Sequence, residues 1–427
     1  MVQTETGSVS DRAEYEETRP VLSGVSGREA ADVANGPHGA GDGARGALML
    51  PEEAAILDLL GSHHQGAVLA AERAIGEVRA ARPVMVTTGE GQSALAIGAE
   101  AFGPVLAQAF SSQAPGGLRL VLPAPRLIRL GAARVGAGRV RLPALDASEA
   151  VAQVERLVLC VDARLDAPVE EADVLDLGAL DLLGAALLLP AAVLVPCRAD
   201  AFAHVLRVSP ADIAAYRGAQ VRSLRIVGRA PVPLEGAPDT EFVVFRGGEG
   251  LRDQVAIVVG APDLSRPVPV RLHSACLTGD LFGSLKCDCG DQLRDTVQRM
   301  AQGEGGILLY LDQEGRGNGI ANKMRAYQLQ AEGFDTYDAD AALGFGLDQR
   351  RFDFAAEMLR QLNVHAVRVL TNNPVKIAAL KAAGLDVVAQ ERVLGRKTRE
   401  NTRYLASKRD RAGHLIDFSA LEAREAD

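Results

Sequence analysis

Three cysteines in the second half of the sequence have the type and spacing that most clearly indicate chemistry. Cys276, Cys287 and Cys289 fall within fourteen residues at the spacing C-x10-C-x-C. Zn²⁺ favours thiolate ligands, and three protein ligands leave the fourth tetrahedral position to water, as in catalytic zinc sites. Zinc-bound water has a pKa of about 7 and provides a hydroxide nucleophile at neutral pH. Cys287 and Cys289 lie in a polar turn, Lys-Cys-Asp-Cys-Gly, where core packing would not require sulfur. His273 stays open as a fourth ligand that would close the site.

A glycine-rich segment about twenty residues further on has the composition of an anion-binding turn. A predicted strand at 307–311 runs into Asp-Gln-Glu-Gly-Arg-Gly-Asn-Gly at 312–319, and a predicted helix follows at about 321–332. This order places backbone N–H groups and Arg316 where a phosphate would bind. Glycine-rich turns are common, so the segment alone is weak support for a phosphate site. Tyr327 lies in the predicted helix, where an aromatic side chain more often belongs to the core.

Two further groups of charged residues complete the candidate chemistry. Asp348 and Arg350 alternate in Gly-Leu-Asp-Gln-Arg, and Thr371 and Lys376 follow a predicted strand at 367–370. A carboxylate can act as general base, and Arg or Lys can bind phosphate. Taken singly, each of these residues is more often a solvated surface charge.

The composition limits the class of protein that must position these residues. A chain of 427 residues predicts two domains plus tails. The net charge of −9 argues against a protein that mainly grips nucleic acid or an anionic membrane surface. Five cysteines is an odd number, and the first residues lack the basic and apolar regions of a secretory signal. We therefore expect a reducing, cytoplasmic location.

The pattern along the chain predicts an α/β (α+β) protein with two domains, each a mixed sheet with flanking helices. Residues 1–47 are rich in Gly, Glu, Ser and Ala without apolar periodicity, which predicts a disordered tail. The first domain, 48–219, has predicted helices at 52–81 and 92–110 and predicted strands at 83–87, 118–123, 139–142 and 157–161. The second domain covers 220–417, with a predicted strand at 240–245, and 418–427 form a second tail.

Two features of the first domain are less significant than they first look. Residues 182–197 carry no charge, but they are fewer than the roughly 20 that a membrane span needs and contain Pro190. A buried helix followed by a buried strand at 191–195 is the better interpretation. His63 and His64 are adjacent, and neighbours on a helix point about 100° apart, so they seldom share a ligand. We find no catalytic constellation in this domain.

The ordered motifs of the second domain support a family resemblance. The run from Arg271 to Gln292, then QEGRG, KMRAYQLQ, LGF-x-x-D-x-R and TNNPVK, closely resembles GTP cyclohydrolase II, the first committed enzyme of riboflavin synthesis. The resemblance covers roughly residues 220–417. It implies a homodimer that uses zinc, with Mg²⁺ on the triphosphate of its substrate GTP.

The resemblance also assigns roles position by position. It makes Cys276, Cys287 and Cys289 the zinc ligands, Asp348 the proton acceptor, Arg350 the nucleophile toward the α-phosphate, and Tyr327 a tyrosine near the zinc. The positions matching those that hold GTP are Arg271, Leu272, His273, Ser274, Ala275, Gln292, Glu314, Gly315, Arg316, Thr336, Thr371 and Lys376. The sequence departs from the family pattern at Ala275 (usually Glu), Asp312 (often Arg) and Asn318 (often Ile). None of these departures removes a zinc ligand, and Ala275 would weaken a substrate contact.

The first domain resembles, far more loosely, 3,4-dihydroxy-2-butanone 4-phosphate synthase. Where that family has an acidic metal-binding loop, this chain has Arg-Pro-Val-Met-Val-Thr-Thr-Gly-Glu-Gly at 82–91, in which Glu90 alone remains. The Gly-His-Thr segment expected of that family is missing. The resemblance therefore implies a degenerate domain without synthase activity.

The expected reaction converts GTP and water to 2,5-diamino-6-ribosylamino-4(3H)-pyrimidinone 5′-phosphate, formate and pyrophosphate. One alternative is a relative that opens another base, such as a uracil nucleotide, at the same zinc site. A second is an inactive regulator of flavin synthesis, against which the intact cysteines, Asp348 and Arg350 argue. A third is nucleic-acid binding by 392–411, which has eight Lys or Arg. Glu400 and Asp410 interrupt that run, and Tyr404 is its single aromatic residue, so a solvated helix is favoured.

Overall fold

The computed structural model describes residues 66–393, apart from short gaps at 114–116, 133–135, 144–145, 199 and 248–252, together with scattered residues between 395 and 415. The predicted tails at 1–47 and 418–427 lie outside the described residues, as do His63, His64 and the first part of the helix predicted at 52–81. Most of the basic segment 392–411 lies outside them as well.

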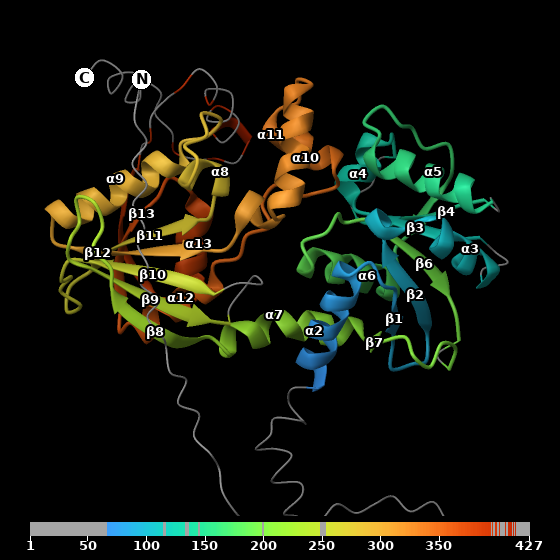
Figure 1. Ribbon diagram of the computed structural model, residues 1–427, viewed down its shortest axis with the longest axis horizontal. Coiled ribbons are helices and arrows are strands. Elements are labelled where there is room, and N and C mark those ends of the chain that lie inside the picture. The colour runs from blue at the N-terminus through green and yellow to red at the C-terminus, as the bar shows by residue number, and fades with distance from the viewer. Residues whose placement is uncertain are drawn as a thin grey trace, which may run out of the picture. The chain divides into compact units, whose positions relative to one another are not determined.

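Two mixed sheets of seven strands each, with flanking helices, confirm the predicted fold class (Figure 1). The first sheet belongs to the N-terminal lobe (residues 66–222) and has the order β5-β4-β3-β6-β2-β1-β7. Its neighbours pair antiparallel except for β1 and β7. The strands are β1 (Val84–Thr87), β2 (Ser93–Gly98), β3 (Arg119–Leu122), β4 (Gly138–Arg141), β5 (Val169–Glu171), β6 (Ala192–Pro196) and β7 (Arg207–Val208).

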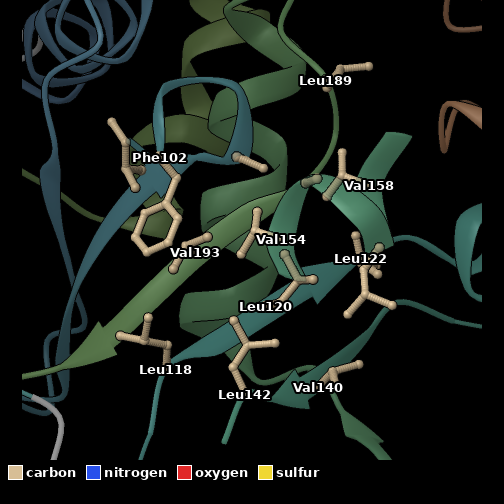
Figure 2. Close-up of a cluster of buried hydrophobic side chains, with 14 of the residues drawn as sticks. Phe102, Leu118, Leu120, Leu122, Val140, Leu142, Val154, Val158, Leu189 and Val193 are labelled. Atoms are coloured by element: carbon tan, nitrogen blue, oxygen red, sulfur yellow. The ribbon is translucent and has the colours of Figure 1, made fainter. Parts of the chain in front are cut away.

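Side-chain alternation along these strands buries both faces of the first sheet. On β2, Leu95 and Ile97 join one apolar cluster, while Ala94 and Ala96 join another, because successive side chains point to opposite faces. Figure 2 shows the first cluster, with Leu120 and Leu122 of β3 close to Val154. Helices α3 (Pro104–Gln113), α4 (Ala124–Arg129) and α5 (Ala147–Leu159) cover that face. Helices α2 (Gly66–Arg79), α6 (Val174–Ala185) and α7 (Pro210–Arg222) cover the other.

Two elements predicted in this lobe are wrong. The helix predicted at 92–110 is a strand in its first part, since β2 occupies Ser93–Gly98 with all six residues buried, and a short 3-10 helix, η1 (Ala99–Ala101), then leads to α3. Burial between β1 and β6 outweighs the helix propensity of the alanines. The strand predicted at 157–161 is the end of α5, which begins at a capping box made by Asp146 and Glu149. The uncharged stretch does form a helix end followed by the buried strand β6.

The second sheet belongs to the C-terminal lobe (residues 225–391), with the order β14-β13-β11-β12-β10-β9-β8. It begins at β8, before the strand predicted at 240–245, which is β9. Strands β8, β9, β10 and β12 pair antiparallel, whereas β12, β11, β13 and β14 run parallel. The strands are β8 (Arg225–Pro231), β9 (Thr240–Arg246), β10 (Gln254–Val259), β11 (Val268–Ser274), β12 (Gly306–Leu311), β13 (Ala366–Leu370) and β14 (Asp386–Glu391).

Helices cover both faces of this sheet, and the candidate site lies at one of its edges. Helices α12 (Asp353–Gln361) and α13 (Pro374–Ala382) pack on one face, and α9 (Cys289–Gln302) packs on the other. The carboxyl ends of the parallel strands β11, β12 and β13 meet at one edge, where α/β proteins commonly bind ligands. Cys276 follows the end of β11, Glu314 and Arg316 follow that of β12, and Thr371 follows that of β13. Among the described residues, no helix has the length and apolar character needed to cross a membrane.

Candidate active site

The three predicted metal ligands come together in one sulfur cluster. Cys276 lies just past the end of β11, and Cys287 and Cys289 lie at the start of α9. Their Sγ atoms all lie within 4.8 Å of one another, and Cys276 and Cys287 are 3.6 Å apart. Tetrahedral Zn–S bonds of about 2.3 Å place two sulfurs about 3.8 Å apart, so this spacing fits zinc. Within the described part of the chain, this is the one group of three or more potential metal ligands.

Glycines make room for the cluster. A Cβ on Gly279, in the short helix α8 (Leu277–Asp280), would lie 2.8 Å from the Cys287 sulfur and 3.1 Å from the Cys276 sulfur. A Cβ on Gly290 would lie 2.2 Å from the carbonyl oxygen of Gly279. A side chain at Gly279 would displace the sulfurs, and one at Gly290 would displace the backbone of Gly279, so the space around the cluster depends on both glycines.

The ionisation of the thiols favours a bound cation. Hydrogen bonds from Cys287 and Cys289, followed by the charge of Lys323, lower the pKa of Cys276 far below its usual value. The same contact with Cys276 raises the pKa of Cys287 to about 11, and the pKa of Cys289 lies well above its usual value. Three adjacent thiolates would repel one another, and a divalent cation would offset that repulsion. The residues present therefore fit a metal ion.

A lysine that sequence reasoning missed lies directly against the cluster. Lys323, on α10 (Ile320–Ala331), places its amine 3.1 Å from the Cys276 sulfur, 3.0 Å from the Thr278 hydroxyl and 2.8 Å from the Glu314 carboxylate. Tyr327 lies one turn further along α10, with the Lys323 amine 5.5 Å and the Lys286 amine 4.8 Å from its ring centroid. Burial raises the pKa of Tyr327 to about 12. The i, i+4 spacing of Lys323 and Tyr327 was the available signal for this pair.

A buried hydrogen-bonded group fixes the backbone of the first cysteine. The Asp280 carboxylate accepts the Cys276 backbone N–H at 2.9 Å and the Tyr310 hydroxyl at 3.0 Å, and His273 Nε2 lies 3.1 Å from it. The ring of His273 stacks on Tyr310, and burial lowers the pKa of His273. His273 is thus bonded to Asp280 and lies outside the sulfur cluster. Asp280 and Tyr310 were not singled out from the sequence.

Asp348 and Arg350 form a two-pronged ion pair near the end of β11. Arg350 Nε and a terminal nitrogen donate to the two carboxylate oxygens of Asp348 at 2.9 and 2.6 Å. The other terminal nitrogen of Arg350 lies 3.5 Å from the Ser274 hydroxyl. Burial raises the pKa of Asp348, but the hydrogen bonds and charge of Arg350 outweigh it, so this pKa lies below its usual value. Asp348 is therefore ionised at neutral pH.

The remaining candidate cations surround the strand ends. Arg271 is buried, donates to Gln292 at 2.5 Å, and has a pKa lowered to about 10 by burial. The Lys376 amine donates to the Leu272 carbonyl oxygen at 2.6 Å. Arg316 donates to the Thr336 carbonyl oxygen and to Asp340, and it lies over the Tyr337 ring.

The turn after β12 holds a strained backbone. In η2 (Glu314–Gly317), both Gly315 and Arg316 have φ of 61°, which is costly for the arginine. Glu314 accepts the Leu277 backbone N–H at 2.6 Å, linking this turn to the start of α8. This linkage places η2 beside the cysteine cluster.

Other predicted contact positions offer mainly backbone or lie at element ends. The Leu272 side chain belongs to the core, and the Ala275 N–H is bonded to the Leu311 carbonyl oxygen. Thr371 is buried and accepts the Asn373 N–H, and Thr336 begins α11 (Thr336–Ala342). The structure thus gathers the predicted residues around one edge of the second sheet.

Comparison with known proteins identifies the family. Residues 225–392 match the model of the GTP cyclohydrolase II family. A GTP cyclohydrolase-2 from Shewanella amazonensis is 44% identical over 185 residues, which are 43% of this chain and 89% of that protein. The chain belongs to the GTP cyclohydrolase II family. A GTP cyclohydrolase-2 from Xylella fastidiosa is 52% identical over 254 residues, 58% of this chain and 64% of that relative. The chain thus spans less than two thirds of the Xylella protein.

Similar proteins also include a riboflavin biosynthesis protein and a solved structure. The riboflavin biosynthesis protein RibBA of Salinispora arenicola is 41% identical over 215 residues, 50% of this chain and 51% of that protein. Among solved structures, a two-domain 3,4-dihydroxy-2-butanone 4-phosphate synthase from A. baumannii covers 76% of this chain and 99% of its own, at 18% identity and a TM-score of 0.30. That level of similarity carries no argument about activity.

Proposed function

We propose that the chain is a zinc-dependent GTP cyclohydrolase II of riboflavin biosynthesis. It would convert GTP and water to 2,5-diamino-6-ribosylamino-4(3H)-pyrimidinone 5′-phosphate, formate and pyrophosphate. The observation that carries this proposal is the sulfur cluster of Cys276, Cys287 and Cys289 on the same sheet edge as the Asp348–Arg350 pair. Both lie within the segment that matches the family.

The metal has a defined place in this proposal. The three cysteines would hold zinc, which supplies an activated water for attack on C8 of guanine when it is bound. Lys323 donates to Cys276 and Asp280 holds the Cys276 backbone, so both keep that ligand in place.

The protein's own residues would then move protons and orient the substrate. Tyr327 keeps its proton at neutral pH because burial raises its pKa, so it can donate to the opening imidazole ring. Asp348 is ionised and suits the role of proton acceptor. For Asp348 to accept a proton, its two-pronged bond with Arg350 has to loosen, which frees Arg350 to engage the α-phosphate.

The triphosphate would lie among the cations at the strand ends. Arg271, Arg316 and Lys376 supply local positive charge despite the net negative charge of the chain. Mg²⁺ would accompany the triphosphate and neutralise part of its charge. Pyrophosphate is the expected leaving group. We further propose that the chain forms a homodimer, which native mass measurement on the purified protein would test. We also propose a cytoplasmic location.

The direct experiment combines metal analysis with turnover on the full chain. We expect about one zinc per chain and release of formate and pyrophosphate from GTP, with none from UMP. Cys287→Ser should lose zinc and activity together, whereas Cys160→Ser, an exposed cysteine of the N-terminal lobe, should retain both. Base opening of UMP instead of GTP would favour the uracil-nucleotide alternative. Zinc binding without turnover of either would favour an inactive regulator.

A further inference from the structure

Two helices that carry active-site residues pack into the core of the N-terminal lobe. Ala326 of α10, Ala339 of α11, and Leu343 and Phe345 just beyond α11 belong to the same buried cluster as Leu120 of β3. Helix α4 lies against α11 (Figure 1). The clusters that bury the second sheet, as far as the structure describes them, contain none of these four residues. The apolar face of the helix pair is therefore covered by the other lobe.

A buried arginine of the N-terminal lobe bonds the end of α11. Arg126 is 2% exposed, and its guanidinium donates to the carbonyl oxygens of Leu157, Cys160 and Ala342 at 2.7–2.8 Å. Leu157 and Cys160 lie in its own lobe, whereas Ala342 is the last residue of α11. A cation at a helix C-terminus interacts favourably with the helix dipole. One side chain thus joins α5 to the end of α11.

Glycines permit close contact at both ends of the helix pair. Gly344, with φ of +91°, leaves a Cβ position only 3.1 Å from Pro123 and 3.2 Å from Pro190. Gly319, just before α10, leaves one 3.2 Å from the Leu187 side chain. The Asn322 amide then donates to the Leu187 carbonyl oxygen at 3.1 Å.

An ion pair adds a third contact along α10. Arg325 lies 2.5 Å from the carboxylate of Glu100, whose other oxygen accepts the Leu189 N–H. Arg325 lies between Lys323 and Tyr327 in the sequence of α10. The N-terminal lobe therefore contacts the helix pair at both ends and along its length.

These contacts bear on the chemistry because of what the helices carry. Lys323 and Tyr327 lie on α10, and α11 carries Thr336 at its start and Asp340, the partner of Arg316. We infer that the N-terminal lobe is a scaffold that positions α10 and α11 in the active site, with Arg126 as its main positioning residue. This role rests on the proposed GTP cyclohydrolase function, and it gives a lobe without a recognisable catalytic constellation a part in the reaction.

The test uses the full chain with Arg126→Met, which keeps an unbranched apolar stem and removes the donors to all three carbonyls. Ile75→Ala is the matched control, because Ile75 is a buried residue of the other cluster of the same lobe. Hydrogen exchange is followed at residues 320–342 and, as an internal reference, at α12 in the core of the second sheet. Zinc content, and KM and kcat for GTP, are measured on the same samples.

We expect Arg126→Met to lower exchange protection at 320–342 at least tenfold relative to α12, with zinc content unchanged. The KM for GTP should rise about tenfold and kcat should fall less, while Ile75→Ala changes neither KM nor the relative protection. If Arg126→Met does not fold, Gly344→Ala tests the same contact from the opposite side. Unchanged relative protection at 320–342 in a folded variant would overturn the scaffold role. Hydrogen exchange does not depend on turnover, so it tests the scaffold role even if the chain proves inactive on GTP.

Discussion

Replacing Asp280 by Asn should weaken metal binding without removing any sulfur ligand. The carboxylate of Asp280, whose side chain is 2% exposed, accepts from the Cys276 backbone N–H and the Tyr310 hydroxyl, and contacts His273. The Cys276 N–H and the Tyr310 hydroxyl donate to the same oxygen of Asp280, so the single acceptor oxygen of Asn can take both while its amide group faces His273. Both buried donors would then keep an acceptor that no longer carries a negative charge.

The size of the effect follows from the number and kind of bonds weakened. A hydrogen bond to a charged group contributes about 1.5–3 kcal/mol and a neutral one about 0.5–1.5 kcal/mol, so removing the charge from two bonds should lower the free energy of unfolding by about 2–3 kcal/mol. Only the bond to Cys276 acts on a metal ligand directly. Mutation of a residue that bonds a metal ligand in this way typically lowers metal affinity by about 10–100-fold, which is about 1.4–2.8 kcal/mol.

Competition with a chromophoric zinc chelator at pH 7.5 measures this loss of affinity directly. Tyr310→Phe is the matched control, because it removes one donor but leaves the Asp280–Cys276 bond in place. We expect its zinc dissociation constant to rise less than fivefold, against about 10–100-fold for Asp280→Asn. Equal zinc affinity of Asp280→Asn and the parent chain would refute the reasoning that Asp280 positions Cys276.

Three further changes have defined outcomes. Gly290→Ala should lose zinc and stability, because its Cβ would lie 2.2 Å from the Gly279 carbonyl oxygen. Gly76→Ala, whose Cβ would point into open space on α2, should instead raise the free energy of unfolding by about 1 kcal/mol. Thermal unfolding and metal analysis of both variants test this difference. Asp348→Asn should flatten the loss of stability between pH 5 and 3. The folded pKa of Asp348 lies below the unfolded value of about 3.9, so the ion pair stabilises the fold above that pH, and this contribution is lost as the pH falls. Urea unfolding at pH 5 and pH 3 measures the change in the free energy of unfolding, and an equal change in Asp348→Asn and the parent chain would contradict this. Tyr327→Phe should lower kcat about 10²–10⁴-fold with zinc retained, and a kcat within threefold of the parent would exclude proton donation by Tyr327.

The sequence predicts those parts of the site whose residues are close together in the chain. The three cysteines span fourteen residues, so local spacing pointed to a metal cluster, whereas the family resemblance singled out Asp348 and Arg350, which are two residues apart. Lys323 reaches Cys276 across 47 positions, and Tyr310 reaches Asp280 across 30. Such contacts depend on strand register and on the rotation of α10, which local patterns do not encode.

The alternation of apolar segments predicts the fold class, but it predicts the wrong type for two elements. Ser93–Gly98 reads as helix from its alanines, and its place between β1 and β6 makes it a strand. The end of α5 reads as strand because Leu157 and Val158 are adjacent apolar residues, although they continue a helical stripe with Ala150 and Val154. The packing of α10 and α11 on the N-terminal lobe could not be predicted from local sequence patterns either. It joins residues more than 100 positions apart, as in the bond from Arg126 to Ala342.

The most direct test of the proposed chemistry follows a single carbon atom of GTP. The zinc-loaded chain is incubated with GTP carrying ¹³C at C8, and the products are followed by ¹³C NMR, with Cys287→Ser as the blank. We expect the label to leave the guanine ring and accumulate as formate, in step with pyrophosphate release and only with the parent chain. Label that stays in the nucleotide while zinc is bound, or formate released equally by Cys287→Ser, would contradict the proposed function.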